Sequence, residues 1–212
     1  MGWYTWFEVT ILFYMNLDIY KKKLKEVREK GRIMMCDVLR NIHGKSADDI
    51  LEMCGAADEI PISLNRIMKF LKISAIPFDF SEIEAIPEIK AQVDTKGEIL
   101  GAVVIKDDKA GIFYRESDSN NRQRFTIAHE LAHCCLDTVD FQNGHLQFRM
   151  ENDKEPSEFA ANTFAGELLV PESKLREFIK RVPDITAIML ADIFNVSESV
   201  MNERLRILNI KL

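Results

Sequence analysis

Five consecutive residues, His129-Glu130-Leu131-Ala132-His133, place two imidazoles and a carboxylate at a spacing that can do chemistry. On an α-helix, residues four apart lie about 40° apart around the axis and one turn along it. Both histidines can therefore bind one tetrahedral zinc ion, with bonds of about 2.0–2.1 Å. Glu130 lies one step around the helix, so it cannot be a third ligand but can hold a metal-bound water as catalytic base.

The pattern supplies two ligands, and a third must come from elsewhere in the chain. Asp137 lies on the same stripe as His129 but about 12 Å along the helix axis, which is too far. His145 follows Asn143-Gly144, a turn signal, and is expected in a loop, where it could equally be a surface histidine. Neither residue is the preferred third ligand.

A second apolar helix is expected from Ser157 to Pro171, and it offers a better carboxylate. Glu158 shares one helix face with small or polar residues at i+3, i+4 and i+7. Small residues at matching spacing on both helices allow close approach: Ala128 and Ala132 on the first, Ala161 and Ala165 on the second. Close approach would bring Glu158 to the metal.

Asn162, one turn after Glu158, is placed to accept a hydrogen bond from a ligand histidine's second ring nitrogen, the usual outer partner of such a ligand. The nearby acids Glu151, Glu155 and Glu167 are weaker alternatives to Glu158. A helix-terminal carboxylate favoured by the helix dipole is the other interpretation of Glu158.

The two helices together resemble the ImmA/IrrE family of metallopeptidases. The segments that carry the resemblance are R-F-T-I-A-H-E-L-A-H at 124–133 and E-x-x-A-N-x-F-A-x-E-L-L-x-P at 158–171. The upstream helix at 61–64, the strand pair and the tail at 190–205 are also similar, so that the likeness spans about residues 58 to 212. One departure is Ala132, where family members often carry Gly.

The resemblance implies zinc ligands at His129, His133 and Glu158 and catalysis by Glu130. Such proteins typically cleave or inactivate helix-turn-helix repressors of the XRE type, as anti-repressors in transcription regulation, often on mobile genetic elements. The resemblance therefore implies a zinc endopeptidase whose protein substrate is an XRE-family repressor. Three protein ligands leave one position for water, as in catalytic zinc sites.

A tetrahedral intermediate also needs a donor for its oxyanion. His145 or Tyr114 could provide this donor, and the sequence does not distinguish between them. The strand containing Tyr114, residues 110–114, would hold an extended substrate by strand addition if it were the sheet edge above the site.

The order of patterns predicts an α+β, mainly helical, zincin-like domain with a small antiparallel sheet. Strands are expected at 78–80, 100–105 and 110–114, the last two as a hairpin, and helices from about 121 to the end. We expect an N-terminal helical extension at 1–57, a metallopeptidase domain at 58–182 and a C-terminal helix-turn-helix-like segment at 183–212.

Charge and composition limit which classes of partner are expected. With 28 basic and 34 acidic residues, the formal charge is −6, so nucleic acid is not the expected partner. Residues 184–212 carry four acids and three bases, which favours packing or repressor docking over DNA binding. The four cysteines lack a disulfide framework and are expected as reduced thiols in a cytoplasmic protein.

The apolar run from Trp3 to Met15 is too short for a transmembrane segment and lacks the features of a signal peptide. It is expected to pack as an extra helix or strand; attachment to a membrane surface and sequence ahead of a start at Met15 are the alternatives.

Two other functions remain open. One is a non-catalytic module that binds a repressor and keeps the metal as a relic. The other is a zinc amidohydrolase of the deformylase kind, which needs a cysteine ligand. The sequence around Cys54 fits that role poorly, and this function would leave Glu158 without a role. Manganese or iron could also occupy such a site. Substrate, activating signal and oligomeric state are not set by these residues.

Overall fold

The computed structural model describes residues 37–212 except 107–108, 137–144 and 153–154. In this part of the chain, ten helices surround one four-stranded mixed sheet, in keeping with the expected α+β class. Residues 1–36 lie outside the described part, and with them most of the expected N-terminal helical extension and the apolar run at 3–15. No described helix is long and apolar enough to cross a membrane.

The sheet has the strand order β1-β3-β2-β4. Its strands are β1 Ile73–Phe78, β2 Ile99–Lys106, β3 Lys109–Arg115 and β4 His145–Met150. The antiparallel β2–β3 hairpin confirms the expected strand pair. The prediction of a purely antiparallel sheet was wrong, because β1 runs parallel to β3.

Two further expectations about strands are corrected. Residues 110–114 are not a sheet edge, because β3 is hydrogen-bonded to β1 on one side and to β2 on the other. The segment after residue 121 is not helical throughout, because β4 pairs with β2 and forms an edge of the sheet. His145 is therefore the first residue of a strand, opposite Ile105, and not part of a loop.

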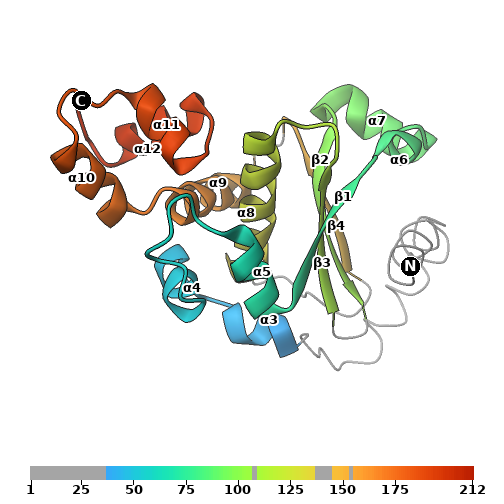
Figure 1. The fold of residues 1–212 in the computed structure, drawn as a ribbon. Coiled ribbons are helices and arrows are strands. Elements are labelled where there is room, and N and C mark those ends of the chain that lie inside the picture. Colours follow the sequence, from blue (N-terminus) through green and yellow to red (C-terminus); the bar gives the residue numbers. More distant parts are fainter. Residues whose placement is uncertain (1–36, 107–108, 137–144, 153–154) are drawn as a thin grey trace. The chain divides into compact units, whose positions relative to one another are not determined.

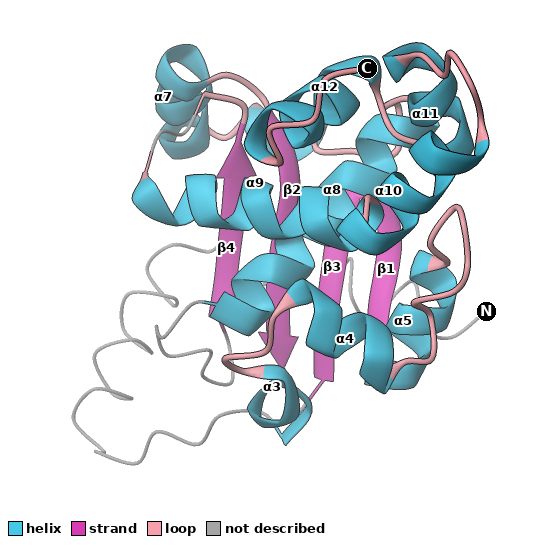
Figure 2. Ribbon diagram, turned by 90° about the vertical axis from the view of Figure 1, so that its left-hand side faces the viewer, coloured by secondary structure: helices cyan, strands magenta, loops and turns pink. Residues whose placement is uncertain are grey.

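The helix that carries the paired histidines is α8, Asn120–Leu136. It lies against one face of the sheet, and α9, Pro156–Leu169, lies against α8 (Figures 1 and 2). Alternate strand positions supply the sheet's side of this core, among them Val103, Ile105 and Ile112. The small residues predicted to allow close approach are all buried in the same core: Ala128, Ala132, Ala161 and Ala165.

Helices α3 Asp37–Ile42, α4 Ala47–Met53 and α5 Leu64–Leu71 add to the same core. Ser46 caps α4 in a reciprocal arrangement: its side chain accepts from the Asp49 amide, and the Asp49 carboxylate accepts from the Ser46 amide. Ser63 caps α5 by a single bond, in which its hydroxyl accepts from the Arg66 amide. Lys72, in the left-handed conformation, ends α5, and Ile73 begins β1.

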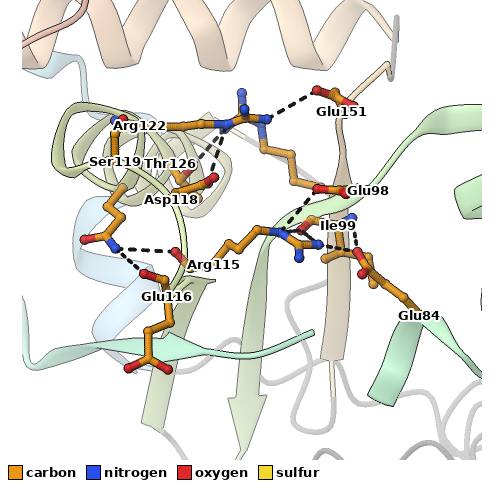
Figure 3. A network of polar contacts seen from close by, with 12 residues as sticks. Glu84, Glu98, Ile99, Arg115, Glu116, Asp118, Ser119, Arg122, Thr126 and Glu151 are labelled. Atoms are coloured by element: carbon orange, nitrogen blue, oxygen red, sulfur yellow. Dashed lines mark hydrogen bonds and ion pairs between the residues drawn. The ribbon is translucent and has the colours of Figure 1, made fainter. Parts of the chain in front are cut away.

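A polar network ties the sheet, at Ile99 and Arg115, to α6 Ser81–Glu84, which precedes α7 Pro87–Lys96 (Figure 3). The Arg115 guanidinium pairs with Glu84 and donates to the Ile99 carbonyl at 2.8 and 3.0 Å. Glu84 also accepts from the Ile99 amide at 2.7 Å. Arg122, on the first turn of α8, pairs with Asp118 and Glu151, so that the network also holds the start of the histidine helix.

The chain ends in α10 Glu172–Arg181, α11 Ala187–Phe194 and α12 Glu198–Ile207. Asn195, in the left-handed conformation, turns the chain between the last two helices. The Thr186 side chain caps α11, and Asp184, which has a positive φ, lies before that helix. The buried Arg204 guanidinium donates to the Val170 carbonyl and pairs with Glu167, which fixes α12 to α9.

Candidate metal centre

His129 and His133 lie on one stripe of α8 and face α9, and both side chains are buried. Their Nε2 atoms are 3.0 Å apart. This is the result of the four-residue spacing, which stacks the two rings on successive turns. Two imidazole nitrogens therefore point at one place in the interior of the protein.

Glu158, in the first turn of α9, brings a carboxylate to the same place. Its two oxygens lie 3.0 Å from His129 Nε2 and 3.1 Å from His133 Nε2. In the described part of the chain, these three residues are the group whose donor atoms lie close enough together to hold a metal ion, all within 4.8 Å. The structure thus brings together the three side chains that the sequence suggested as ligands.

The donor set fits a tetrahedral metal ion. Bonds of about 2.0–2.1 Å from a tetrahedral centre put neighbouring ligand atoms about 3.3 Å apart, close to the separations seen here. Asn162 Oδ1 accepts a hydrogen bond from His129 Nδ1 at 2.9 Å. That bond holds the proton of His129 on Nδ1, so Nε2 presents its lone pair to the shared position. Asn162 therefore lies beside the second ring nitrogen of a candidate ligand histidine, the position expected for it from the sequence.

Electrostatics favour the protonation states that a metal requires. Burial lowers the pKa of His129 to about 4, so its imidazole is neutral near pH 7. Burial tends to raise the pKa of Glu158, but the nearby His129 and His133 rings outweigh that effect and hold the pKa below its usual value. A neutral imidazole and an ionised carboxylate are the forms that bind divalent ions.

Glu130 is buried on the neighbouring face of α8, turned toward the sheet. Its carboxylate lies against Gly101 of β2, where a Cβ atom would be 2.9 Å from Glu130 Oε1 and 2.7 Å from Thr126 Cγ2. Only glycine leaves room for this close approach of helix and strand. Sequence reasoning missed Gly101, although a glycine inside a strand is itself a signal of close backbone approach.

Replacing Gly101 with Ala is expected to displace Glu130 and α8, since contacts below 3.0 Å force atoms to move. We expect the free energy of unfolding to fall by about 1–3 kcal/mol, as for other overpacked sites. Urea denaturation measures this change.

Gly166→Ala is the matched control. Its added Cβ meets no atom within 4 Å, and alanine is the better residue inside a helix by about 0.5–1 kcal/mol. Equal stability changes in the two variants would contradict the close contact at Gly101.

Arg149 of β4 is a second residue that sequence reasoning missed. It is opposite Gly101 in the β2–β4 register, as Tyr114 is in the β2–β3 register. Directly opposed residues of antiparallel strands share a face of the sheet. Tyr114 and Arg149 therefore flank the glycine that Glu130 rests on.

The Arg149 guanidinium extends toward α8. It lies 5.6 Å above the Phe125 ring and donates to Thr126 Oγ1 at 3.4 Å. Burial lowers its pKa, and the charges of Glu130 and Glu158 oppose that effect. An arginine remains charged even so, which places a fixed cation beside both carboxylates of the site. A lone arginine in a strand carried no signal of this in the sequence.

The two oxyanion candidates from the sequence are placed differently. Tyr114 is half-buried on the same sheet row as Gly101. The backbone puts His145 four residues from Arg149, about 13 Å along β4. The side chain of His145 is outside the described part of the structure.

Such a donor set, on adjacent helices packed against a small mixed sheet, has the layout of a single-metal hydrolase site of the metallopeptidase class. The chain matches the model of the IrrE N-terminal-like domain over residues 94–206, more than half of its length. It therefore belongs to the ImmA/IrrE family of peptidases, which confirms the resemblance read from the sequence. No curated protein matches the chain significantly.

Proposed function

We propose that the protein is a zinc-dependent endopeptidase with a zincin-like active site, in which His129, His133 and Glu158 hold the metal. The observation that carries this proposal is the meeting of two imidazole nitrogens and one carboxylate at separations of 3.0–3.1 Å. Membership of a metallopeptidase family supports it. When bound, zinc supplies a Lewis acid that polarises a carbonyl and lowers the pKa of water.

Glu130 is the general base in this proposal. It takes a proton from the attacking water and later gives it to the leaving amine, as one carboxylate can do in both steps. Two observations support this role for Glu130: it follows His129 directly on α8, and its carboxylate lies against Gly101. Burial of Glu130 keeps bulk water away from the proton that it carries.

Arg149 is the group that we propose to meet the developing negative charge of the tetrahedral intermediate. A guanidinium has five N–H donors, and the hydrogen bond to Thr126 uses one of them. The charges of Glu130 and Glu158 both act on Arg149, and its backbone lies opposite Gly101, against which the Glu130 carboxylate rests. Tyr114, on the same sheet row, is the second candidate, retained from the sequence.

The Arg149→Met variant is expected to lose about 10²- to 10³-fold in kcat, the usual effect of removing one oxyanion donor. Methionine keeps the apolar stem over Phe125 but removes the charge. Steady-state kinetics on a peptide substrate measures the loss, and zinc content should not change.

Arg122→Met is the matched control, because in the described part of the chain the ion pairs of Arg122 are with Asp118 and Glu151, near the surface. If the two variants had the same kcat, Arg149 would have no role in the transition state.

The edge strand β4 is the place where we expect an extended substrate to bind. It pairs with β2 and carries Arg149 near its end. Backbone groups on an edge strand can pair with a peptide by strand addition. This replaces the earlier expectation for residues 110–114, which lie inside the sheet.

The substrate that we propose is a regulatory protein, an XRE-type helix-turn-helix repressor, which follows from the family resemblance. Direct DNA binding is not part of the proposal. Of the three bases in residues 184–212, Arg204 is buried against Val170 and Arg206 is paired with Glu203. Little positive charge is left there to meet phosphate.

The test is incubation of zinc-loaded protein with a candidate XRE-type repressor, followed by mass spectrometry of the products. Cleavage at one site by the native protein, absent for Glu130→Gln, supports the peptidase. If both proteins inactivate the repressor equally and no peptide is released, the function is sequestration, the non-catalytic alternative.

A further inference from the structure

An open groove of about 660 Å³ lies between the residues that lead into α11, the second half of α12 and the residues that follow α12. We call it the tail groove; the lining residues used below are Asp184, Ile185, Ala187, Leu205, Ile210 and Leu212. None of the three candidate metal ligands lines it. The tail groove is therefore separate from the metal centre.

The tail groove is apolar, and large apolar side chains in it and beside it are exposed. Ile185 and Leu205 are buried within it, whereas Leu212 is 54% exposed. Ile188 and Met189 follow directly after Ala187 of the groove and are 57% and 45% exposed. A single exposed apolar residue is ordinary, but a group of them indicates a surface that a partner covers.

Helix α11 is apolar on more than one side. Leu190 and Phe194 are buried against the rest of the protein, whereas Ile188 and Met189 face solvent. Asp192 is the one charged residue among the eight of this helix. A helix that is apolar all round is normally buried on all sides. The exposed side of α11 therefore has the composition of a buried surface.

The charge around the tail groove is negative. Of the four acids and three bases in residues 184–212, Glu203, Arg204 and Arg206 are engaged in ion pairs within the protein. The remaining charged residues are three acids and one base: Asp184, Asp192, Glu198 and Lys211. Asp184 lines the groove itself. A partner's lysines and arginines would be attracted here, whereas nucleic acid and anionic membranes would be repelled.

The tail groove is fixed to both helices that carry the candidate metal ligands. Asn121 Nδ2, in the first turn of α8, donates to the Val196 carbonyl in the turn between α11 and α12, at 3.1 Å. Arg124 Nε donates to the Asn195 carbonyl, also at 3.1 Å. Arg204 joins α12 to α9. A protein segment bound in the groove is therefore held at a constant position relative to the metal centre.

We propose that the tail groove is a docking site, remote from the bond that is cut, for a basic amphipathic helix of the protein substrate. The apolar side chains of that helix cover Ile188, Met189 and Leu212, and its lysines or arginines face Asp184 and Asp192. Helices form the walls of the groove and offer no strand edge to an extended peptide, so an occupant that satisfies its own backbone suits it better. This inference rests on the proposed function and adds which part of the substrate is recognised.

Two synthetic peptides test the docking site without turnover. Both are helical, of about 18 residues, with leucines at i, i+3, i+4 and i+7; the other positions carry lysine and alanine in one and glutamate and alanine in the other. Isothermal titration calorimetry measures binding to the full chain with Glu130→Gln, so that neither peptide is cut. The lysine peptide should bind at least about 10-fold more tightly than the glutamate peptide. Equal affinities, or no saturable binding of the lysine peptide, would overturn the proposal.

Surface variants of the same chain locate the binding. Leu212→Ser should weaken the lysine peptide about 5- to 20-fold, because part of the burial of a leucine side chain is lost. Asp184→Asn should weaken it about 2- to 5-fold, and asparagine tolerates the positive φ at this position. The matched controls are Phe70→Ser, 55% exposed on α5, and Asp94→Asn, exposed on α7, and both should bind the peptide as the native chain does. Native affinity in both groove variants would overturn the proposal.

Kinetics on a whole repressor separates this inference from the proposed function. If the protein cuts the repressor, Leu212→Ser should raise KM by about the same factor as it weakens the peptide. An unchanged KM would overturn the docking site and leave the peptidase standing. If the protein cuts no repressor but binds the lysine peptide in this groove, the docking site stands and the peptidase fails. A dimer that Leu212→Ser separates in analytical ultracentrifugation would assign the groove to a second copy and overturn the proposal.

Discussion

Glu158→Gln protein is expected to bind zinc more than about 100-fold more weakly than the native protein. Loss of a ligand's outer partner alone costs 10- to 100-fold in other metal sites, and here a ligand charge itself is removed. Glutamine keeps the shape of the side chain, so α9 should still pack against α8. Zinc titration with a competing chelator measures the change, with circular dichroism to show that the helices persist.

Glu155→Gln is the matched control for this prediction. Glu155 precedes α9 and is exposed, and it was one of the weaker ligand candidates in the sequence. Its variant should bind zinc as the native protein does. If Glu158→Gln kept native zinc affinity, the third ligand would have to be another residue.

Glu130→Gln is expected to lower kcat by about 10²- to 10⁴-fold, the usual contribution of a general base. Its zinc affinity should stay within about threefold of native, since Glu130 is not among the three converging donors. Glutamine fits beside Gly101 but cannot accept a proton.

Steady-state kinetics on the cleaved repressor or a peptide spanning its cut site measures the loss in the Glu130 variant. Metal analysis of the same sample is the control. Full activity in a protein that holds one zinc would rule out Glu130 as the base.

The site was predictable where it depends on local spacing. His129 and His133 meet because a helix places residues four apart on one face, whatever the rest of the fold does. The approach of α9 was predictable from small residues on both helices, which the structure buries together. These two features carry Glu158 to the histidines.

The sheet was less predictable, because its pairing is not local. Nothing in Ile73–Phe78 shows that it will lie parallel to β3 and not antiparallel to it. Strand β4 (HLQFRM) alternates polar and apolar residues as a half-buried strand does, but this signal was missed because the chain after residue 121 was interpreted as helical to its end. With β4 missed, Arg149 could not be placed beside Glu130, nor could the edge of the sheet be assigned.

The contact between α9 and α12 was not predictable from local spacing either, because only tertiary structure brings the two helices together. The tail was expected to pack or to dock a repressor, and Arg204 does join α12 to α9.

The most direct test of the metal centre is a crystal structure of zinc-loaded protein with anomalous data collected on both sides of the zinc absorption edge. We predict one strong peak, bonded to His129 Nε2, His133 Nε2 and a Glu158 oxygen at about 2.0–2.2 Å. A protein with no peak there, or with zinc held by other residues, would contradict this account.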